Sequence, residues 1–244
     1  MSAFWDDHAT RIDPDRFRAD TQYLGCQAEY PYEAMLKDVR HTEATPPWRG
    51  VLGLLTEDGA FGCTTKVVDG VTVSRDLLDS CVELAFLERH LPDHLVGVTR
   101  VLDIGAGYGR LAHRWQTAYP QVDYRCVDPV SASRLVCAKY LRHRGLESRV
   151  YSPAELDELP TPDLAVNVHS WPECTREEIR WWLRWLRERE VPRLFVVPHD
   201  PEVLCADDGQ PFLSDIAWHG YTLAEHWYGP ACWPRTFLLY ERTT

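Results

Sequence analysis

The segment Val101–Arg110, VLDIGAGYGR, constrains the fold more than any other part of the chain. Its first four residues suit a buried strand, and the residues after it follow a helical pattern. Three alternating glycines, Gly105, Gly107 and Gly109, join the two patterns. Glycine adopts backbone angles that other residues avoid and has no side chain to block a ligand. The segment therefore predicts a strand, a tight turn and a helix, with room for a flat nucleoside over the turn.

The chain after residue 74 alternates between strand and helix patterns. Predicted strands cover Arg100–Ile104, Asp123–Val127, Arg149–Tyr151, Leu164–Val168 and Leu194–Val197, and predicted helices follow Ser74 and cover Arg110–Ala118, Ser133–Arg144 and Arg176–Glu190. Parallel strands need crossover helices, so this alternation predicts a mostly parallel α/β sheet with both faces covered. Tyr221–Tyr228 and Thr236–Glu241 lack an intervening helix and predict an antiparallel C-terminal strand pair.

Residues 1–73 have an irregular, Pro- and Gly-marked texture that differs from the main domain, residues 74–244. Cys63–Val68 and Val71–Val73 are β-branched runs joined by Asp69-Gly70, which is a strong signal for a two-residue hairpin. We therefore expect a small N-terminal extension with a β-hairpin. The extension either caps the ligand pocket or covers an edge of the sheet.

Charge and composition exclude several classes of partner. The formal net charge of −11 disfavours DNA and RNA, because their binding normally depends on Lys and Arg that displace counterions. The eight cysteines include no C-x-x-C pair, which favours reduced thiols over a zinc site. The N-terminus lacks the basic start and apolar run of a secretory signal, and no apolar run is long enough to span a bilayer. These features predict a cytoplasmic protein with no membrane or nucleic-acid partner.

The glycine spacing separates two classes of cofactor. A dinucleotide fingerprint, G-x-G-x-x-G, would require glycine at position 110, where this chain has Arg110. The turn instead reads G-x-G-x-G, with Asp103 as an acid in the preceding strand, and so resembles the first motif of class I methyltransferases. The resemblance implies a Rossmann-like sheet, S-adenosylmethionine as methyl donor and S-adenosylhomocysteine as product. It places cofactor contacts at Asp103, Gly105, Ala106, Gly107, Tyr108 and Gly109.

Two later positions extend the expected cofactor site. Asp128, followed by Pro129, ends the next strand, where a carboxylate can accept both hydroxyls of a ribose. Nicotinamide enzymes also have an acid there, so Asp128 predicts a ribose without choosing the cofactor. Ala154 and Glu155 follow the third strand, where the resemblance implies contact with adenine. The run Ser152–Glu155 is equally typical of an N-capped helix start, and both interpretations stay open.

The segment Asp163–Glu173, DLAVNVHSWPE, is a predicted strand that delivers polar residues to the reacting edge of the sheet. Its Asn-x-x-Ser pattern followed by an acid is similar to that of sugar O-methyltransferases. By pattern the resemblance covers about the last two thirds of the chain. It implies a cofactor contact at Asn167 and an acceptor such as a sugar or a sugar-bearing natural product. His169 and Trp171 depart from the family's segment, so its substrate contacts do not transfer to this chain.

Methyl transfer to a hydroxyl needs alignment and a base that accepts the hydroxyl proton. His169, just past the fourth strand, is the first candidate for this catalytic base, and His199, after the fifth strand, is the second. Either histidine can instead be structural. Glu173, His199, Asp200, Asp207 and Asp208 offer ligands that suit Mg²⁺, but Asp207-Asp208-Gly209 is equally a turn, and we predict no metal site.

These observations predict an S-adenosylmethionine-dependent O-methyltransferase that acts on a small polar acceptor. Methylation of nitrogen or carbon is the nearest alternative, since only the acceptor differs. A nicotinamide-dependent oxidoreductase and a non-catalytic cofactor-binding protein are alternatives from other classes. Trp181 and Trp185 share one stripe of a predicted helix and either extend the core or contact a second subunit. A homo-oligomer therefore stays open.

Overall fold

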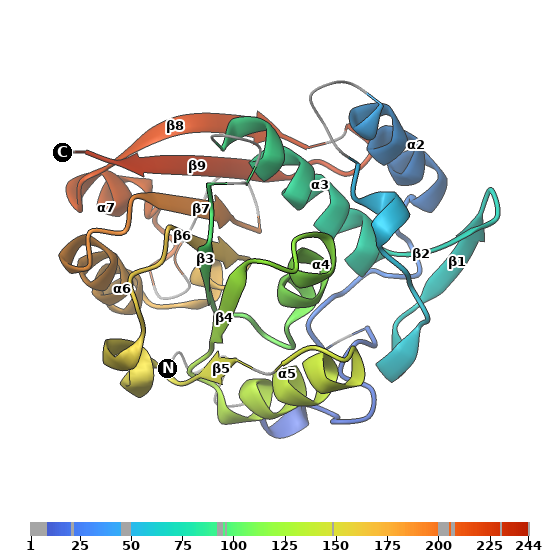
Figure 1. The fold of residues 1–244 in the computed structure, drawn as a ribbon, viewed down its shortest axis with the longest axis horizontal. Coiled ribbons are helices and arrows are strands. Elements are labelled where there is room, and N and C mark those ends of the chain that lie inside the picture. The colour runs from blue at the N-terminus through green and yellow to red at the C-terminus, as the bar shows by residue number, and fades with distance from the viewer. Residues whose placement is uncertain are drawn as a thin grey trace.

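The computed structural model describes residues 9–20, 22–44, 50–91, 95, 97–147, 149–199, 205, 208–229 and 231–243. Within these residues a seven-stranded sheet forms the centre of the molecule (Figure 1). Its strands are β3 (Arg100–Ile104), β4 (Asp123–Val127), β5 (Val150–Tyr151), β6 (Leu164–Val168), β7 (Arg193–Val197), β8 (Tyr221–Tyr228) and β9 (Thr236–Arg242). A separate antiparallel hairpin consists of β1 (Thr65–Val68) and β2 (Val71–Ser74).

The order of the strands in the sheet is β5-β4-β3-β6-β7-β9-β8. Strands β3 to β7 pair in parallel, and β9 pairs antiparallel with both β7 and β8. The chain runs outward from β3 to β5 and then returns to β6 on the other side of β3. In such a sheet the loops at the carboxyl ends of β3 and β6 diverge and leave a crevice for a ligand. The predicted mostly parallel α/β sheet with an antiparallel C-terminal pair is confirmed.

Helices cover both faces of the sheet. The helices are α2 (Tyr32–Glu43), α3 (Arg75–His90), α4 (Arg110–Ala118), α5 (Ser131–His143), α6 (Arg176–Glu188) and α7 (Leu213–Trp218), with 3₁₀ turns η1 (Ala9–Arg11), η2 (Leu52–Leu54), η3 (Ala60–Gly62), η5 (Pro153–Glu158) and η6 (Trp171–Glu173). Neighbouring strand residues point to opposite faces. Val101 therefore packs with α3, α4 and α5, whereas Leu102 packs with α6 and α7.

Local signals set several element boundaries. The Ser74 hydroxyl accepts a hydrogen bond from the Leu77 amide at 3.0 Å and begins α3, as the sequence predicts. Asp69 and Gly70 both have positive φ, 48° and 77°, as a tight hairpin turn requires. The first strand of the hairpin begins at Thr65, two residues later than predicted, and α5 begins two residues earlier, at Ser131. Shifts of this size are usual where element ends fray.

Helix α2 lies in the extension, and the sequence analysis did not predict it. Its buried residues Tyr32, Met35, Leu36 and Val39 recur at helical spacing and pack against α3. In Figure 1, α2 and the β1–β2 hairpin lie beside α3 at the edge of the molecule. Phe17 and Met35 belong to the same core cluster as the sheet. The extension therefore shares the core of the main domain, and a boundary at residue 74 stays a prediction.

The tryptophans of α6 divide between core and surface. Trp185 is buried in the core cluster on the α6 side of the sheet, whereas Trp181 is 41% exposed. All eight cysteines are free. No helix in the described ranges is long and apolar enough to cross a membrane.

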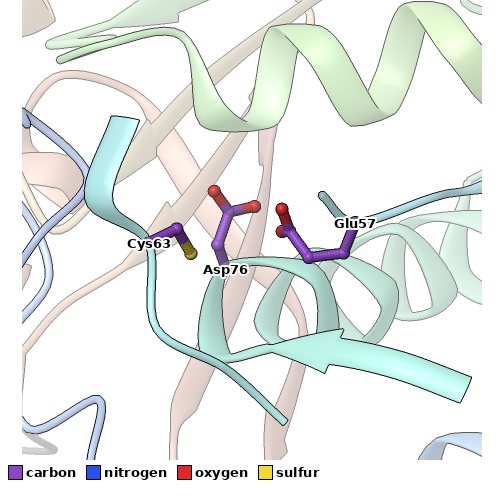
Figure 2. A group of neighbouring side chains, drawn as sticks. All are labelled: Glu57, Cys63 and Asp76. Carbon is purple, nitrogen blue, oxygen red and sulfur yellow. The ribbon is translucent and has the colours of Figure 1, made fainter. Parts of the chain in front are cut away.

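A buried ionic network joins the extension to the main domain. Asp76 of α3 accepts hydrogen bonds from Arg18 at 2.8 Å and from Arg114 of α4 at 3.1 Å, and both arginines also bind Glu57. All four side chains are fully buried. Figure 2 shows that Glu57, Cys63 and Asp76 point toward one another, in an arrangement that resembles a metal site. Two guanidinium groups already balance the two carboxylates, so the cluster is an ionic link between elements.

Candidate active site

A cavity of about 360 Å³ opens at the carboxyl ends of the central strands. The loops after β3, β4, β6 and β7 supply most of its wall, through Gly105, Asp128, His169 and His199. Residues 22–25 of the extension close one side of it. In parallel sheets a ligand binds at the carboxyl ends of the strands, where the connections from two neighbouring strands run in opposite directions. The cavity lies at this position.

The glycines of the loop after β3 serve different purposes. A Cβ at Gly105 would lie 2.0 Å from the Ser170 Oγ, so no other residue allows the two loops to approach. A Cβ at Gly107 would lie 3.1 Å from the ring of Tyr23. Gly105, Ala106, Gly107 and Tyr108 line the cavity, and their contacts with the cofactor stay predictions. Gly109 does not line the cavity; it is the N-cap of α4, and its missing Cβ makes room for Cys137 of α5.

Asp128 lies at the end of β4 and faces the cavity beside Pro129, as expected for a ribose contact. Its Oδ2 accepts a hydrogen bond from the Gly107 amide at 2.9 Å, and its Oδ1 accepts one from the Val130 amide at 2.8 Å. Each carboxylate oxygen has a second lone pair, which leaves two acceptors for a pair of hydroxyls. Burial raises the pKa of Asp128 to about 7.

Asp103, the acid of β3, also lines the cavity. The Tyr124 hydroxyl donates a hydrogen bond to its Oδ2 at 2.9 Å. Burial is the largest cause of a pKa that is raised to about 7, although the Tyr124 bond acts in the opposite direction. The cavity wall therefore contains two buried carboxyl groups whose pKa values are raised to about 7.

Besides Gly109, three predicted cofactor residues lie away from the cavity wall. Glu155 accepts hydrogen bonds from the amide and the hydroxyl of Ser152, both at 2.7 Å, and completes the capping box that was the alternative interpretation. Ala154 stands beside it in the same 3₁₀ turn, and neither residue lines the cavity. Asn167 is fully buried and bridges the Ile104 carbonyl and the Trp171 amide. Adenine contact by Ala154 and Glu155, and cofactor contact by Asn167, stay predictions.

The two histidines proposed as bases lie together in the cavity wall, with ring centroids 5.2 Å apart. His169 has a φ of 64°, a left-handed conformation that is uncommon for residues other than glycine. Its Nδ1 is buried and makes no hydrogen bond within the described part of the chain. Burial, and then the positive charge of Arg235, lower the pKa of His169 well below 6.5. His169 is therefore neutral at pH 7 and has a nitrogen that can take up a proton.

His199 has a different environment. Its Nε2 lies 3.6 Å from Glu173 Oε1, and its side chain is 45% exposed. Of the other residues considered as Mg²⁺ ligands, Asp208 pairs with Arg176 at 2.7 Å and does not line the cavity. Asp200 and Asp207 lie outside the described residues. Of the three members of that set that the structure describes, Glu173 and His199 lie together and Asp208 lies apart from them.

The cavity also contains residues that the sequence analysis missed. Tyr23 of the extension covers Gly107 and donates a hydrogen bond to Ser133 Oγ at 2.8 Å. Arg75, at the start of α3, and Arg235, just before β9, line the wall. Arg110, noted only for its effect on the glycine spacing, binds Glu83 through two hydrogen bonds of 2.7 and 2.8 Å. These residues come from distant parts of the chain, and no local pattern marks them.

No protein-family model and no curated protein matches the sequence. Solved structures match in fold. The mitomycin 7-O-methyltransferase MmcR matches with a TM-score of 0.52 and 16% identity, over 69% of this chain and 56% of that chain. Magnesium protoporphyrin IX methyltransferase ChlM from Synechocystis PCC 6803, with bound S-adenosylhomocysteine, matches with a TM-score of 0.50 and 14% identity, over 68% of this chain and 82% of that chain.

An S-adenosylmethionine-dependent methyltransferase from Clostridium acetobutylicum ATCC 824 also has a TM-score of 0.50, with 10% identity over 68% of this chain and 90% of that chain. The chain has the class I methyltransferase fold. The Rossmann-like sheet that the glycine motif implied is therefore confirmed. The matched part spans little more than half the length of MmcR, and identities this low are evidence for the fold alone.

Proposed function

We propose that this protein is an S-adenosylmethionine-dependent methyltransferase that methylates an oxygen of a small polar acceptor, such as a sugar or a sugar-bearing natural product. His169 carries the proposal, because a histidine that is neutral at pH 7 lines the same cavity as the glycine loop. The neighbours in fold are S-adenosylmethionine-dependent methyltransferases, and MmcR is an O-methyltransferase. A hydroxyl acceptor needs a base, whereas many nitrogen and carbon nucleophiles do not.

The residues of the site suit the cofactor. A nucleoside with two ribose hydroxyls fits this site. Gly105 and Gly107 have no side chain to block it, and each carboxylate oxygen of Asp128 has a second lone pair for a hydroxyl. When bound, S-adenosylmethionine supplies a methyl group activated by a sulfonium. The imidazole of His169, in the cavity wall, accepts the hydroxyl proton, and Tyr23 helps to exclude water from the glycine loop. Alignment of acceptor and methyl group by the cavity wall provides most of the remaining rate enhancement.

Product analysis tests the proposed reaction. The protein is incubated with a methyl-labelled donor and a panel of sugars, other hydroxylated small molecules, amines and carbon nucleophiles, and the labelled products are identified. Label on a hydroxyl oxygen is the expected result. Label on nitrogen or carbon would overturn the oxygen assignment, and binding of S-adenosylhomocysteine without any turnover would favour a non-catalytic role.

A calorimetric comparison separates the methyltransferase from a nicotinamide-dependent oxidoreductase. We expect S-adenosylhomocysteine to bind and NADH not to bind. Arg110 stands where a dinucleotide-binding turn has its third glycine, which that turn needs for close packing of its helix against the strand, and Arg110 is instead paired with Glu83. Tight binding of NADH with no response to S-adenosylhomocysteine would contradict the cofactor assignment.

Substitution of Asp128→Ala should weaken S-adenosylhomocysteine binding. Loss of two charge-assisted hydrogen bonds of about 1.5 to 3 kcal/mol each predicts a loss of affinity of about 100-fold or more. Isothermal titration calorimetry measures the change. Asp123→Ala is a matched control, because Asp123 lies at the opposite end of the same strand and pairs with Arg125 and Arg149. Equal affinities of the Asp128→Ala variant and the unmodified protein would remove Asp128 from the ribose site.

The affinity for S-adenosylhomocysteine should also depend on pH. The pKa of Asp128 is about 7 in the ligand-free protein, and ribose hydroxyls donate to the ionised form. Binding therefore expels a proton below pH 7, and the dissociation constant should rise by about tenfold for each pH unit below that value. Calorimetry at several pH values measures the slope. Asp128→Asn should flatten it, and a slope that this variant leaves unchanged would assign the proton to another group.

A further inference from the structure

Three arginines line the cavity, but only two carboxylates, Glu83 and Asp79, pair with them. Arg110 and Glu83 form a complete pair through two hydrogen bonds. Arg75 and Arg235 instead share one carboxylate, since both contact Asp79 Oδ2, at 3.3 and 3.1 Å. The other oxygen of Asp79 accepts a hydrogen bond from the Tyr30 hydroxyl at 2.6 Å. Among the described residues, neither Arg75 nor Arg235 has a second acidic partner, so the group carries one excess positive charge.

The two guanidinium groups are held in place by aromatic rings. The Cζ atoms of Arg75 and Arg235 each lie 5.3 Å from the ring centre of Trp233, and Arg75 also lies over Tyr30. Their side chains are only 10% and 13% exposed. Arg235 uses Nη2 for Asp79, and its Nε and Nη1 make no hydrogen bond to any described residue. Buried donors and an unbalanced buried charge are costly unless a ligand satisfies them.

The excess charge lies near the proposed base. Both arginines line the cavity with His169, and Arg235 is the strongest of the charges acting on that histidine. Guanidinium groups present planar donors that match a carboxylate. A carboxylate would balance the single excess charge, whereas a dianionic phosphate would exceed it. We propose that Arg75 and Arg235 bind a carboxylate of the acceptor and hold its hydroxyl toward His169, so that the substrate is a hydroxy acid.

This inference rests on the proposed function for the acceptor, but its test is a binding measurement. Benzoate and its neutral isostere benzamide are titrated into protein saturated with S-adenosylhomocysteine. Benzoate should bind with a dissociation constant on the order of 1 mM, and benzamide at least about tenfold more weakly. Equal binding of the two compounds, or no saturable binding of benzoate, would overturn the proposal.

The variant Arg235→Gln tests the residue itself. It should weaken benzoate binding by about tenfold or more, because a charge-assisted pair is lost. Asp79 keeps Arg75 and Tyr30 as partners, so the variant should still fold. Arg193→Gln is the control, since it also removes one positive charge but lies at the opposite end of β7. Unchanged benzoate affinity in Arg235→Gln would overturn the proposal.

A second comparison tests whether Arg235 binds the carboxylate of the cofactor instead of a carboxylate of the acceptor. S-adenosylhomocysteine carries a carboxylate, whereas 5′-methylthioadenosine lacks the amino-acid part. Arg235→Gln should leave the affinities for both compounds unchanged. A loss of affinity for S-adenosylhomocysteine alone would show that Arg235 holds the cofactor carboxylate, and would overturn the acceptor subsite. If S-adenosylhomocysteine fails to bind the unmodified protein, the cofactor assignment fails instead, and the benzoate comparison on ligand-free protein still tests the subsite.

Discussion

Replacement of His169 by asparagine is expected to lower kcat for methylation of a hydroxyl acceptor by about 10²- to 10⁴-fold, the usual contribution of a general base. Asparagine suits this position because it tolerates the left-handed backbone, here at a φ of 64°. Its amide cannot take up the hydroxyl proton. The measurement is turnover with a labelled methyl donor at saturating cofactor and acceptor.

The interpretation of this variant depends on two further measurements. Affinity for S-adenosylhomocysteine should remain unchanged, because Gly107 and Asp128 keep their hydrogen bond. The control His226→Asn removes a histidine from strand β8, away from the cavity, and should retain full turnover. An unchanged kcat in His169→Asn would exclude His169 as the base and would leave His199 as the candidate. A parallel loss of cofactor affinity would indicate a structural role for His169.

Substitution of Asp76→Asn is expected to lower the free energy of unfolding by about 3 to 5 kcal/mol, because it breaks a buried ion pair and leaves the arginines undercompensated. Asp76 contacts both Arg18 and Arg114, and its Oδ2 also accepts a hydrogen bond from the Tyr108 hydroxyl at 2.5 Å. The carboxylate thus connects the extension, α4 and the glycine loop. Urea denaturation measures the change in stability.

A surface ion pair provides the control. Asp15 pairs with Lys139 at 2.6 Å, but its side chain is 83% exposed. Asp15→Asn should therefore change stability by no more than about 1 kcal/mol. A similarly small effect of Asp76→Asn would mean that the buried network does not hold the extension in place.

The contribution of Asp76 to stability has a defined pH dependence. Its two arginine neighbours hold its pKa far below the ordinary value of 3.8, despite the opposing effect of burial. A carboxyl group with a lowered folded-state pKa stabilises the protein at pH values above the unfolded pKa. The contribution is lost as the pH falls from 3.8 toward the folded-state pKa. Asp76→Asn should therefore differ most from the unmodified protein at neutral pH and least in strong acid.

Local sequence patterns determined the frame of the molecule. Strand periodicity located the parallel strands, and Ser74 and the Asp69-Gly70 turn set the start of α3 and the hairpin. The glycine spacing located the loop after β3 that lines the cavity, and strand ends located Asp128 and His169 at the same cavity. These features depend on hydrogen bonds and side-chain directions within a few residues, which a single sequence displays. Helix α2 had the same periodicity, visible in Met35, Leu36 and Val39, and was overlooked.

Tertiary structure alone decided which distant side chains meet. Arg75 and Arg235 share Asp79, and Tyr23 covers Gly107, although long stretches of chain separate the partners. Charge pairing of this kind depends on how helices and loops pack, and no spacing in the sequence encodes it. Packing also decided that Gly109 serves the contact between α4 and α5. The sequence therefore determined a glycine-rich loop at the end of a strand, and the tertiary packing determined which charged side chains lie around that loop.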